Sequence, residues 1–319
     1  MVSDTSGLSG FVVAAKPVGA SSTDLVKAAR RAVGNGMRVG HCGTLDPLAA
    51  GVLPLAVGRA TRLSGHVLRA PKTYLAAVLF GVRTTTDDLE GEILGCPRPS
   101  PDVSSVLRVL PKFVGTVRQR PPATSAVRAN GRRAYARVRA GEKVVLPERD
   151  VDVYNIRVVA KAWTRIGATG GQVTLGMSKG VSSALVIALE VTCGRGTYIR
   201  SLARDIGSML QCGATLAGLV RTAVGPFRLS DAIQLDGLRR ATAADLTRYM
   251  HPPDVVVEDL PARVLMPDDR EDFLNGRRIM VAPIPSGLCR FYDTGGMFLG
   301  VAVSCGGTWG KRYVTPTRP

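Results

Sequence analysis

Apolar residues along the first 230 positions fall either in short continuous runs or at helical spacing. The runs 10–15 and 73–82 predict two short buried strands. In 21–33 and 197–210 the apolar positions recur every three or four residues, so both segments are expected to be amphipathic helices. Strands and helices therefore mix irregularly along the chain, which favours an α+β fold over a strict alternation of strand and helix.

The remaining pattern predicts a large sheet and a small second domain. Residues 151–193 hold several β-rich segments separated by glycines, which predicts a large mixed, mainly antiparallel sheet flanked by helices. His-Pro-Pro at 251–253 indicates a domain break, after which short strands dominate and suggest a small barrel. We therefore expect one large domain over 1–250 and a small β-rich domain over 251–319.

The charge distribution indicates a polyanionic partner. The formal net charge is +17, and 34 of the 42 cationic residues are arginine, whose planar side chain suits phosphates and stacked bases. Acids and bases balance in 251–319, so the whole excess lies in 1–250. Residues 103–141 contain nine bases and no acid, which marks the segment as a candidate nucleic-acid surface.

Several protein classes are excluded or disfavoured. No apolar run approaches the roughly 18 residues of a membrane span, and the start of the chain lacks the pattern of a secretory signal. Six scattered cysteines form no C-x-x-C pair, so neither a zinc site nor a disulfide framework is expected, and a cytoplasmic location fits best. Because no glycine-rich nucleotide fingerprint is present either, we expect neither a cofactor nor a metal.

One carboxylate, Asp46, stands among apolar and small residues in HCGTLDPLAAGVLP, residues 41–54. Pro47 disfavours helical backbone at the residue before it, so Asp46 is expected on a shaped loop. Its apolar neighbours penalise the ionised form, and a nearby cation would be needed to keep it charged. The residues alone leave two alternatives open: a functional carboxylate with a cationic partner, or an acid that makes an Asx turn or a helix N-cap.

Six segments occur in the order that is typical of one known family. They are AKPVGASS (15–22), HCGTLDPLAAGVLP (41–54), KTY (72–74), QRPPATSAVRANGRRAYARVRAGE (119–142), GRGTYIRSLARDIG (194–207) and CGATLAGLVRTAVGPF (212–227). Together they resemble the motifs of the TruB-type tRNA pseudouridine-55 synthases. Six ordered motifs are far more specific than any one of them. The resemblance implies the pseudouridine synthase fold and, more weakly, a PUA-like RNA-binding domain at the C-terminus.

The resemblance also implies roles for individual residues. Asp46 falls on the family's essential aspartate, and Arg200 on the arginine that pairs with it. Tyr74 matches the tyrosine that stacks on the target base and is implicated in proton transfer at its C5. These three are the predicted catalytic residues. The predicted substrate-binding residues are His41, Lys16, Tyr198, Leu219, Arg132 and Arg133.

The resemblance implies isomerisation of the T-loop uridine of tRNA, with no cofactor, by a monomer that needs no protein partner and no membrane. The target base has to leave its stack before the aspartate can act. A chaperone or RNA-binding protein on the same scaffold is the alternative, and Asp46 argues against it because a pure binder does not need a costly acid. The sequence departs from the family pattern at Ala15, Thr85, Ala123 and Thr124.

Overall fold

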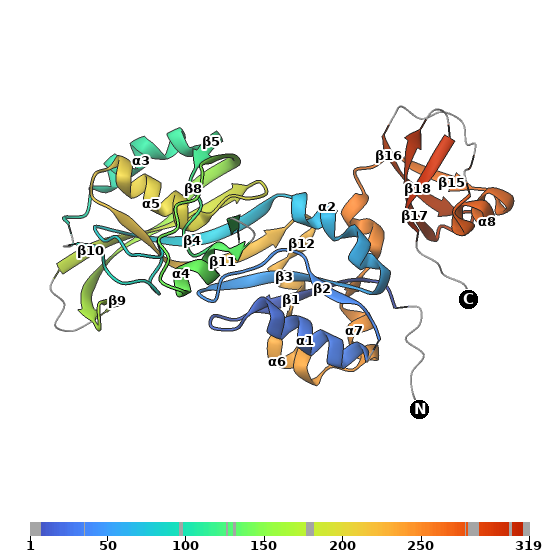
Figure 1. Cartoon of the computed structure of the whole chain (residues 1–319), viewed down its shortest axis with the longest axis horizontal. Helices are drawn as coiled ribbons and strands as arrows, with labels where there is room; N and C mark the ends of the chain where they lie inside the picture. The colour runs from blue at the N-terminus through green and yellow to red at the C-terminus, as the bar shows by residue number, and fades with distance from the viewer. Residues whose placement is uncertain are drawn as a thin grey trace. The chain divides into compact units, whose positions relative to one another are not determined.

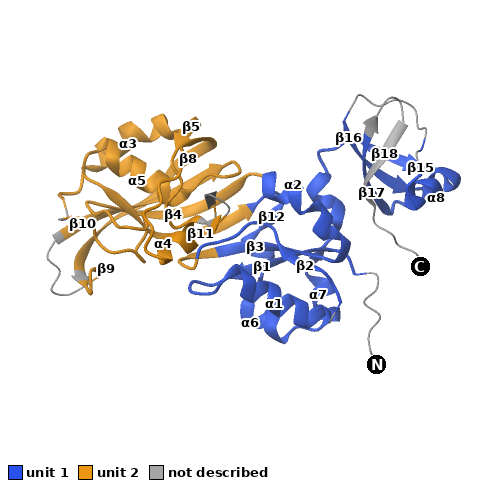
Figure 2. Cartoon of the chain, viewed as in Figure 1, with its two compact units in different colours: residues 1–46, 51–69, 224–319 blue, residues 47–50, 70–223 orange. Residues whose placement is uncertain are grey.

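The computed structural model describes residues 8–34, 36–95, 98–125, 127–129, 132–176, 182–277, 279, 287–305 and 308–314 (Figure 1). The chain divides into two compact units, each built from segments that are distant in sequence (Figure 2). Unit 1 comprises 1–46, 51–69 and 224–319, and unit 2 comprises 47–50 and 70–223. No helix in the described ranges has the length and the apolar run that a membrane span requires.

Unit 1 contains the first strands and helices of the chain and all of its C-terminal elements. Its elements are β1 (Gly10–Lys16), α1 (Ser22–Val33), β2 (Val39–His41), β3 (Ala49–Val57), η1 (Gly58–Leu63), α2 (Ser64–Arg69), β12 (Phe227–Arg228), η3 (Leu229–Asp231), β13 (Ile233–Gln234), α6 (Leu235–Arg240), α7 (Ala243–Arg248), β14 (Met250–His251), η4 (Pro253–Val257), β15 (Ala262–Leu265), α8 (Pro267–Asn275), β16 (Leu288–Asp293), β17 (Phe298–Cys305) and β18 (Thr308–Val314). β1 pairs antiparallel with β3 and β14 and parallel with β13, so the sheet is mixed.

The strand β1 is buried on both faces, which explains why its sequence is continuously apolar rather than alternating. Val12 and Ala14 pack with the apolar face of α1 and with α6 and α7, which lie together below the strands in Figure 1. Phe11 and Val13 pack on the other face with residues of η1, α2 and Phe227. α1 begins at the predicted position because Ser21 and Asp24 form a capping box.

The C-terminal strands of unit 1 form a sheet of their own, in the order β15-β16-β17-β18. Its core joins Phe273 of α8 to Phe291 of β16, whose ring centroids are 4.9 Å apart. Phe298 and Val301 of β17 instead pack in the cluster that contains Phe11, and the Tyr292 hydroxyl donates to Asp254 of η4 at 2.8 Å. The small sheet therefore has its own core and also rests on the N-terminal part of unit 1, and a boundary at 251 stays a prediction.

Unit 2 contains the second group of strands. Its elements are β4 (Lys72–Phe80), α3 (Val103–Val109), η2 (Leu110–Phe113), β5 (Gly115–Gln119), β6 (Arg128–Ala129), β7 (Arg132–Arg133), α4 (Ala134–Arg139), β8 (Arg149–Thr169), β9 (Gln172–Leu175), β10 (Ser182–Cys193), α5 (Ile199–Met209) and β11 (Ala214–Val224). The strand order is β11-β4-β10-β8-β5, with β9 beside β8. β10 pairs antiparallel with β4 and β8, and β8 pairs antiparallel with β5 and β9.

The helix predicted over 197–210 is α5, which begins at Ile199 and ends at Met209. Ile199, Leu202 and Ile206 are buried, as the spacing requires, and α5 contacts both β4 and α3. The expectation of an α+β chain with a large mixed, mainly antiparallel sheet and a small C-terminal β-rich part is confirmed.

Candidate active site

Asp46 lies on the loop between β2 and β3, in unit 1, and is half-buried. Gly43 and Gly51 flank it at φ angles of 112° and 109°, in the left-handed region where glycine costs least. The loop prediction is therefore confirmed. No helix begins after Asp46, because residues 47–48 form a turn and β3 starts at Ala49, so the helix N-cap alternative is wrong.

The residue next to Asp46 is tied to the start of α1 by one hydroxyl. Leu45 donates its backbone N–H to Ser22 Oγ at 3.1 Å, and the same hydroxyl reaches the carbonyl of Leu45 at 3.4 Å. Ser22 is 5% exposed and Leu45 is equally buried, so water competes little for these bonds. The first turn of α1 therefore fixes the backbone that carries the carboxylate of Asp46.

Lys16 and His41 are the last residues of β1 and β2. Lys16 is buried at the end of β1, pairs with Gly51 of β3, and donates from Nζ to the carbonyls of Pro17 and Ala20 at 2.9 and 2.7 Å. It thereby closes the turn that leads into α1. His41 ends β2 opposite Leu55 and is half-buried. Contact of either side chain with RNA stays a prediction.

In unit 2, the buried side chain of Gln119 brackets the N-cap residue of α5, Tyr198. Its Nε2 donates to the carbonyl of Tyr198 at 3.0 Å, and its Oε1 accepts from the Tyr198 N–H at 2.8 Å. The guanidinium of Arg149 lies 5.2 Å from the centre of the Tyr198 ring. Gln119 therefore joins the end of β5 to the N-cap of α5 and satisfies the Tyr198 N–H, one of the backbone donors that the start of a helix leaves without an intrahelical acceptor.

Arg200 lies in the first turn of α5 and forms a buried ion pair with Asp88. Its Nη1 is 3.3 Å from Asp88 Oδ2, and the two side chains are 5% and 2% exposed. Nη1 also donates to the carbonyl of Thr86 at 3.0 Å and to Thr124 Oγ1 at 2.8 Å. The pairing of Arg200 with Asp46, a residue of unit 1, stays a prediction.

Asp88 is held in the turn that follows β4. One carboxylate oxygen accepts from the N–H of Glu90 at 3.0 Å and from the hydroxyl of Thr86. The Asp88 carbonyl accepts from Thr84 Oγ1 at 2.6 Å. Because the turn fixes Asp88, the position of Arg200 is defined by α5 at its backbone and by Asp88 at its guanidinium.

A second ion pair lies one helical turn further along α5. Arg204 Nη1 is 2.8 Å from Asp87 Oδ2, and its Nε is 2.9 Å from Asp205 Oδ1. Burial raises the pKa of the Asp87 carboxyl, although the guanidinium of Arg204 opposes that change. Asp87 has φ 61°, an unusual conformation for a residue with a side chain, which fits a turn whose two acids both face α5.

Tyr74 is a buried residue of β4 and pairs with Val191 of β10. Lys72 lies two residues earlier on the same face of the strand and donates from Nζ to the Ala70 carbonyl at 2.6 Å. Burial, reinforced by the nearby charge of Arg221, lowers the pKa of Lys72 to about 8. The face of β4 that presents Tyr74 is therefore flanked by buried cations.

This lowered pKa predicts a pH dependence of stability. Unfolded Lys72 binds its proton up to about pH 10.5, whereas folded Lys72 loses it above about pH 8, so the free energy of unfolding should rise with pH. Between pH 8 and 9 the rise is about 1 kcal/mol. We expect Lys72→Met to remove this rise in urea unfolding measured at both pH values, and Lys112→Met, at an exposed position, to keep it. Identical slopes in the Lys72→Met protein and its parent would contradict the prediction.

The basic segment contributes exposed arginines around α4. Arg132 is exposed and its Nη1 lies 3.5 Å from Glu142 Oε1, while Arg137 Nε lies 2.6 Å from Glu142 Oε2. The backbone of Arg133 is in β7, and its side chain lies outside the described part of the structure. Leu219 is half-buried in β11. Glu142, which directly follows the acid-free segment 103–141, thus forms ion pairs with Arg132 and Arg137 of that segment.

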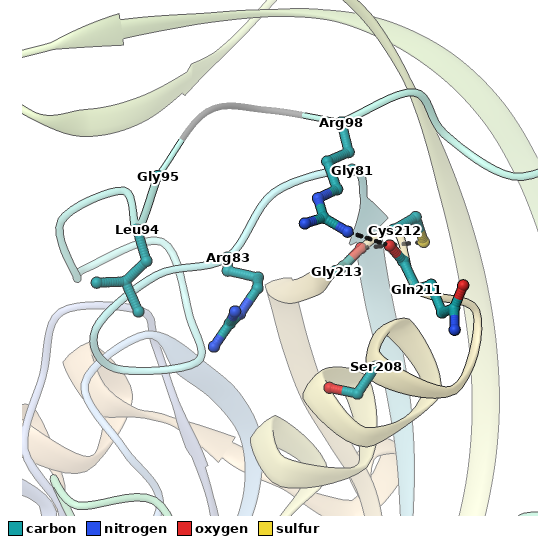
Figure 3. A pocket seen from close by; sticks show the side chains of 9 residues that line it. All are labelled: Gly81, Arg83, Leu94, Gly95, Arg98, Ser208, Gln211, Cys212 and Gly213. Carbon is teal, nitrogen blue, oxygen red and sulfur yellow. Dashed lines mark hydrogen bonds between the residues drawn. The ribbon is translucent and has the colours of Figure 1, made fainter.

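A pocket of about 650 Å³ lies at the C-terminal end of α5. Figure 3 shows Arg83 and Arg98 on its wall, with Arg98 donating to the carbonyl of Gln211 at 2.8 Å. Gly213 has φ 76°, and a Cβ there would lie 2.6 Å from Arg83 Cγ, so only glycine leaves room for the arginine stem. None of the predicted site residues lines this pocket.

Sequence reasoning missed Ser22, Asp88 and Gln119. Each acts through a partner more than 20 positions away, and Asp88 stands in a run of polar residues that is typical of a solvated turn. Only the arginine at 200, which needs a counter-charge once it is buried, gave an indirect signal. Within the described ranges, no group of three or more histidine, cysteine, aspartate or glutamate side chains is placed to hold a metal ion.

Solved structures share the fold. A Cbf5–Nop10–Gar1 complex matches 92% of this chain and 78% of its own with a TM-score of 0.63 and 23% identity. An H/ACA RNP bound to a substrate RNA containing 2'-deoxyuridine matches 97% of this chain and 86% of its own with a TM-score of 0.65 and 22% identity. At this level of identity the similarity supports the fold alone.

Sequence comparison is more specific. Residues 30–199 match the N-terminal domain of TruB family pseudouridylate synthases, and 200–258 match the C-terminal domain of tRNA pseudouridylate synthase B. The tRNA pseudouridine synthase B of Burkholderia mallei is 39% identical over 92% of this chain and 93% of its own length. That of Acaryochloris marina is 38% identical over 97% and 99%. The chain therefore belongs to the TruB family of pseudouridylate synthases.

Proposed function

We propose that this protein isomerises uridine 55 in the T-loop of tRNA to pseudouridine, with Asp46 as the group that acts on a flipped-out nucleotide. The supporting observation is the Asp46 loop, tied to α1 through Ser22, in a chain 39% identical over 92% of its length to a tRNA pseudouridine synthase B. A half-buried carboxylate on a braced loop is arranged to act on a ligand rather than to cap a helix.

The reaction breaks the bond between N1 of uracil and C1' of ribose and forms one between C5 and C1'. The proton lost from C5 is balanced by one gained at N1, so nothing is oxidised, reduced or hydrolysed, and the proposal includes no cofactor or metal. Asp46 acts while the base is detached and turned. Tyr74 stacks on the base, and Arg200 supplies positive charge close to the carboxylate. Such fixed charges act strongly in a site from which water is excluded.

Extrusion of the base from its stack costs a few kcal/mol, which other interactions have to offset. We assign this role to aromatic, cationic and apolar side chains: His41 and Tyr198 for stacking, Arg132 and Arg133 for phosphates, and Leu219 for lining the site. Lys16 keeps the loop before α1 closed. The C-terminal domain, over 251–319, adds a PUA-like RNA contact. We place this activity in a cytoplasmic monomer.

The direct test is incubation with an unmodified tRNA transcript, followed by mapping of the isomerised nucleotide. Pseudouridine at position 55 alone supports the proposal. Tight binding without any product would favour the alternative, a tRNA-folding chaperone on the same scaffold. Product at another uridine would correct the position and keep the chemistry.

The basic segment predicts a salt effect on tRNA binding. Replacing Arg132 and Arg133 with glutamine should weaken binding and lower the slope of log affinity against log salt by about one for each phosphate that is no longer neutralised. The matched control replaces Arg239 and Arg240, two exposed arginines of α6, and should leave the slope unchanged. Filter binding over a salt series measures both. If both double variants gave the parent slope, the RNA would have to lie elsewhere.

A further inference from the structure

One terminal nitrogen of the Arg200 guanidinium, Nη1, has more acceptors within reach than it has hydrogens. Its Nη1 carries two hydrogens, yet three oxygens lie within bonding distance: Thr124 Oγ1 at 2.8 Å, the Thr86 carbonyl at 3.0 Å and Asp88 Oδ2 at 3.3 Å. The neutral hydroxyl lies at the shortest of these distances and the carboxylate at the longest. Thr124 Oγ1 therefore competes with Asp88 Oδ2 for the two hydrogens of Arg200 Nη1.

Thr124 can keep its hydrogen bond with Arg200, because the residues before it are hydrogen-bonded to α5. Gln119 makes two hydrogen bonds with the backbone of Tyr198. The carbonyl of Arg120 accepts from Ser201 Oγ and from Arg204 Nη2, both at 2.8 Å. The backbone carbonyl of Thr124 also accepts from Arg200 Nη2 at 3.3 Å. The hydroxyl of Thr124 thus approaches Arg200 from a fixed backbone.

We propose that Thr124 is a positioning residue that keeps Arg200 from full pairing with Asp88. With the hydroxyl present, one Nη1 hydrogen is taken by a neutral oxygen, and less of the positive charge is neutralised by the buried carboxylate. Without it, Arg200 closes on Asp88, since a charged acceptor forms the stronger bond. The inference rests on the proposed function of Arg200, and it assigns a task to a position where this sequence departs from its family.

The inference predicts a specific pattern of kinetics. Thr124→Val keeps the shape of the side chain and removes the acceptor, so we expect kcat on unmodified tRNA to fall about tenfold, the size of one charge-assisted hydrogen bond. The KM for tRNA should change less than about twofold, because no RNA contact is assigned to this hydroxyl. Thr124→Ser keeps the hydroxyl and should restore kcat to within about threefold of the parent.

Thr116→Val is the matched control. Thr116 lies on β5 of the same unit, and its hydroxyl donates to Asp152 Oδ1 at 2.8 Å, outside the Arg200 network. The same substitution there should leave kcat unchanged. Single-turnover measurement with excess enzyme reports the chemical step, and thermal melting of each variant shows whether the fold is intact.

Three results would overturn the inference: parent-like kcat in Thr124→Val, an equal loss in Thr124→Ser, or a loss that appears in KM alone. If Thr124→Val melts far below the parent, the serine variant decides, since it retains both the acceptor and the backbone. A parent protein that makes no pseudouridine at all would instead contradict the proposed function. The failure of the function and the failure of this inference are therefore distinguishable.

Discussion

Asp46→Asn is expected to abolish pseudouridine formation, with a loss of at least about a thousandfold in the single-turnover rate. The amide has nearly the volume of the carboxylate but is neither a comparable nucleophile nor a base. Its backbone should stay in place, because Ser22 holds Leu45 and not the side chain at 46. Affinity for tRNA should remain within a few-fold, since binding depends mainly on cationic groups that neutralise phosphates.

The matched control for this variant is Asp236→Asn. Asp236 is also in unit 1, its side chain is 74% exposed, and its partner is Arg239 on the same helix. This protein should retain the parent rate, and rates are measured by mapping product after quenching. Appreciable product from Asp46→Asn, at a rate comparable to the parent, would show that another group performs the chemistry.

Asp88→Asn is expected to lower the free energy of unfolding by about 3–5 kcal/mol, because it leaves a buried guanidinium without its carboxylate. Arg200 and Asp88 are both almost fully buried, so water cannot replace the missing charge. Urea unfolding of parent and variant measures the difference.

A double variant tests whether the loss of stability comes from the uncompensated charge of Arg200. Asp88→Asn with Arg200→Met removes both charges and should recover much of the stability that the single variant lacks, although the double variant should be inactive because it lacks the guanidinium of Arg200. Asp236→Asn, which breaks an exposed pair, should cost less than about 1 kcal/mol. A single Asp88→Asn variant as stable as its parent would mean that the ion pair contributes little to folding.

The elements that depend on local pattern were predictable. The capping box at Ser21 and the apolar spacing of α5 each specify a helix within a dozen residues. β8 was not predicted as one strand of 21 residues, because exposed apolar side chains such as Tyr154, Val159 and Trp163 interrupt the alternation of buried apolar and exposed polar positions, and its register shifts twice against β10. α8 was missed as well, since Phe273 is its single buried residue and most of its other residues are polar.

The candidate site shows the same division. The position of Asp46 on a loop followed from Pro47 and the flanking glycines, which act on their immediate neighbours. The ion-pair partner of Arg200 did not follow, since Asp88 is 112 positions away and only the fold brings these two together. Motif resemblance supplied the roles of Tyr74 and Arg200, but it gave no signal for Gln119, which bonds only to backbone.

The link between Ser22 and Leu45 has a consequence for protein engineering. The seven residues HCGTLDP could be taken for a motif that can be transferred by itself. Their backbone conformation, however, depends on the hydroxyl of Ser22, which belongs to a different motif and lies 23 positions before Leu45. If HCGTLDP were grafted alone into another protein, the carboxylate would be present, but its orientation would no longer be fixed. The smallest graft that preserves its orientation also includes the opening turn of α1 and the serine at its first position.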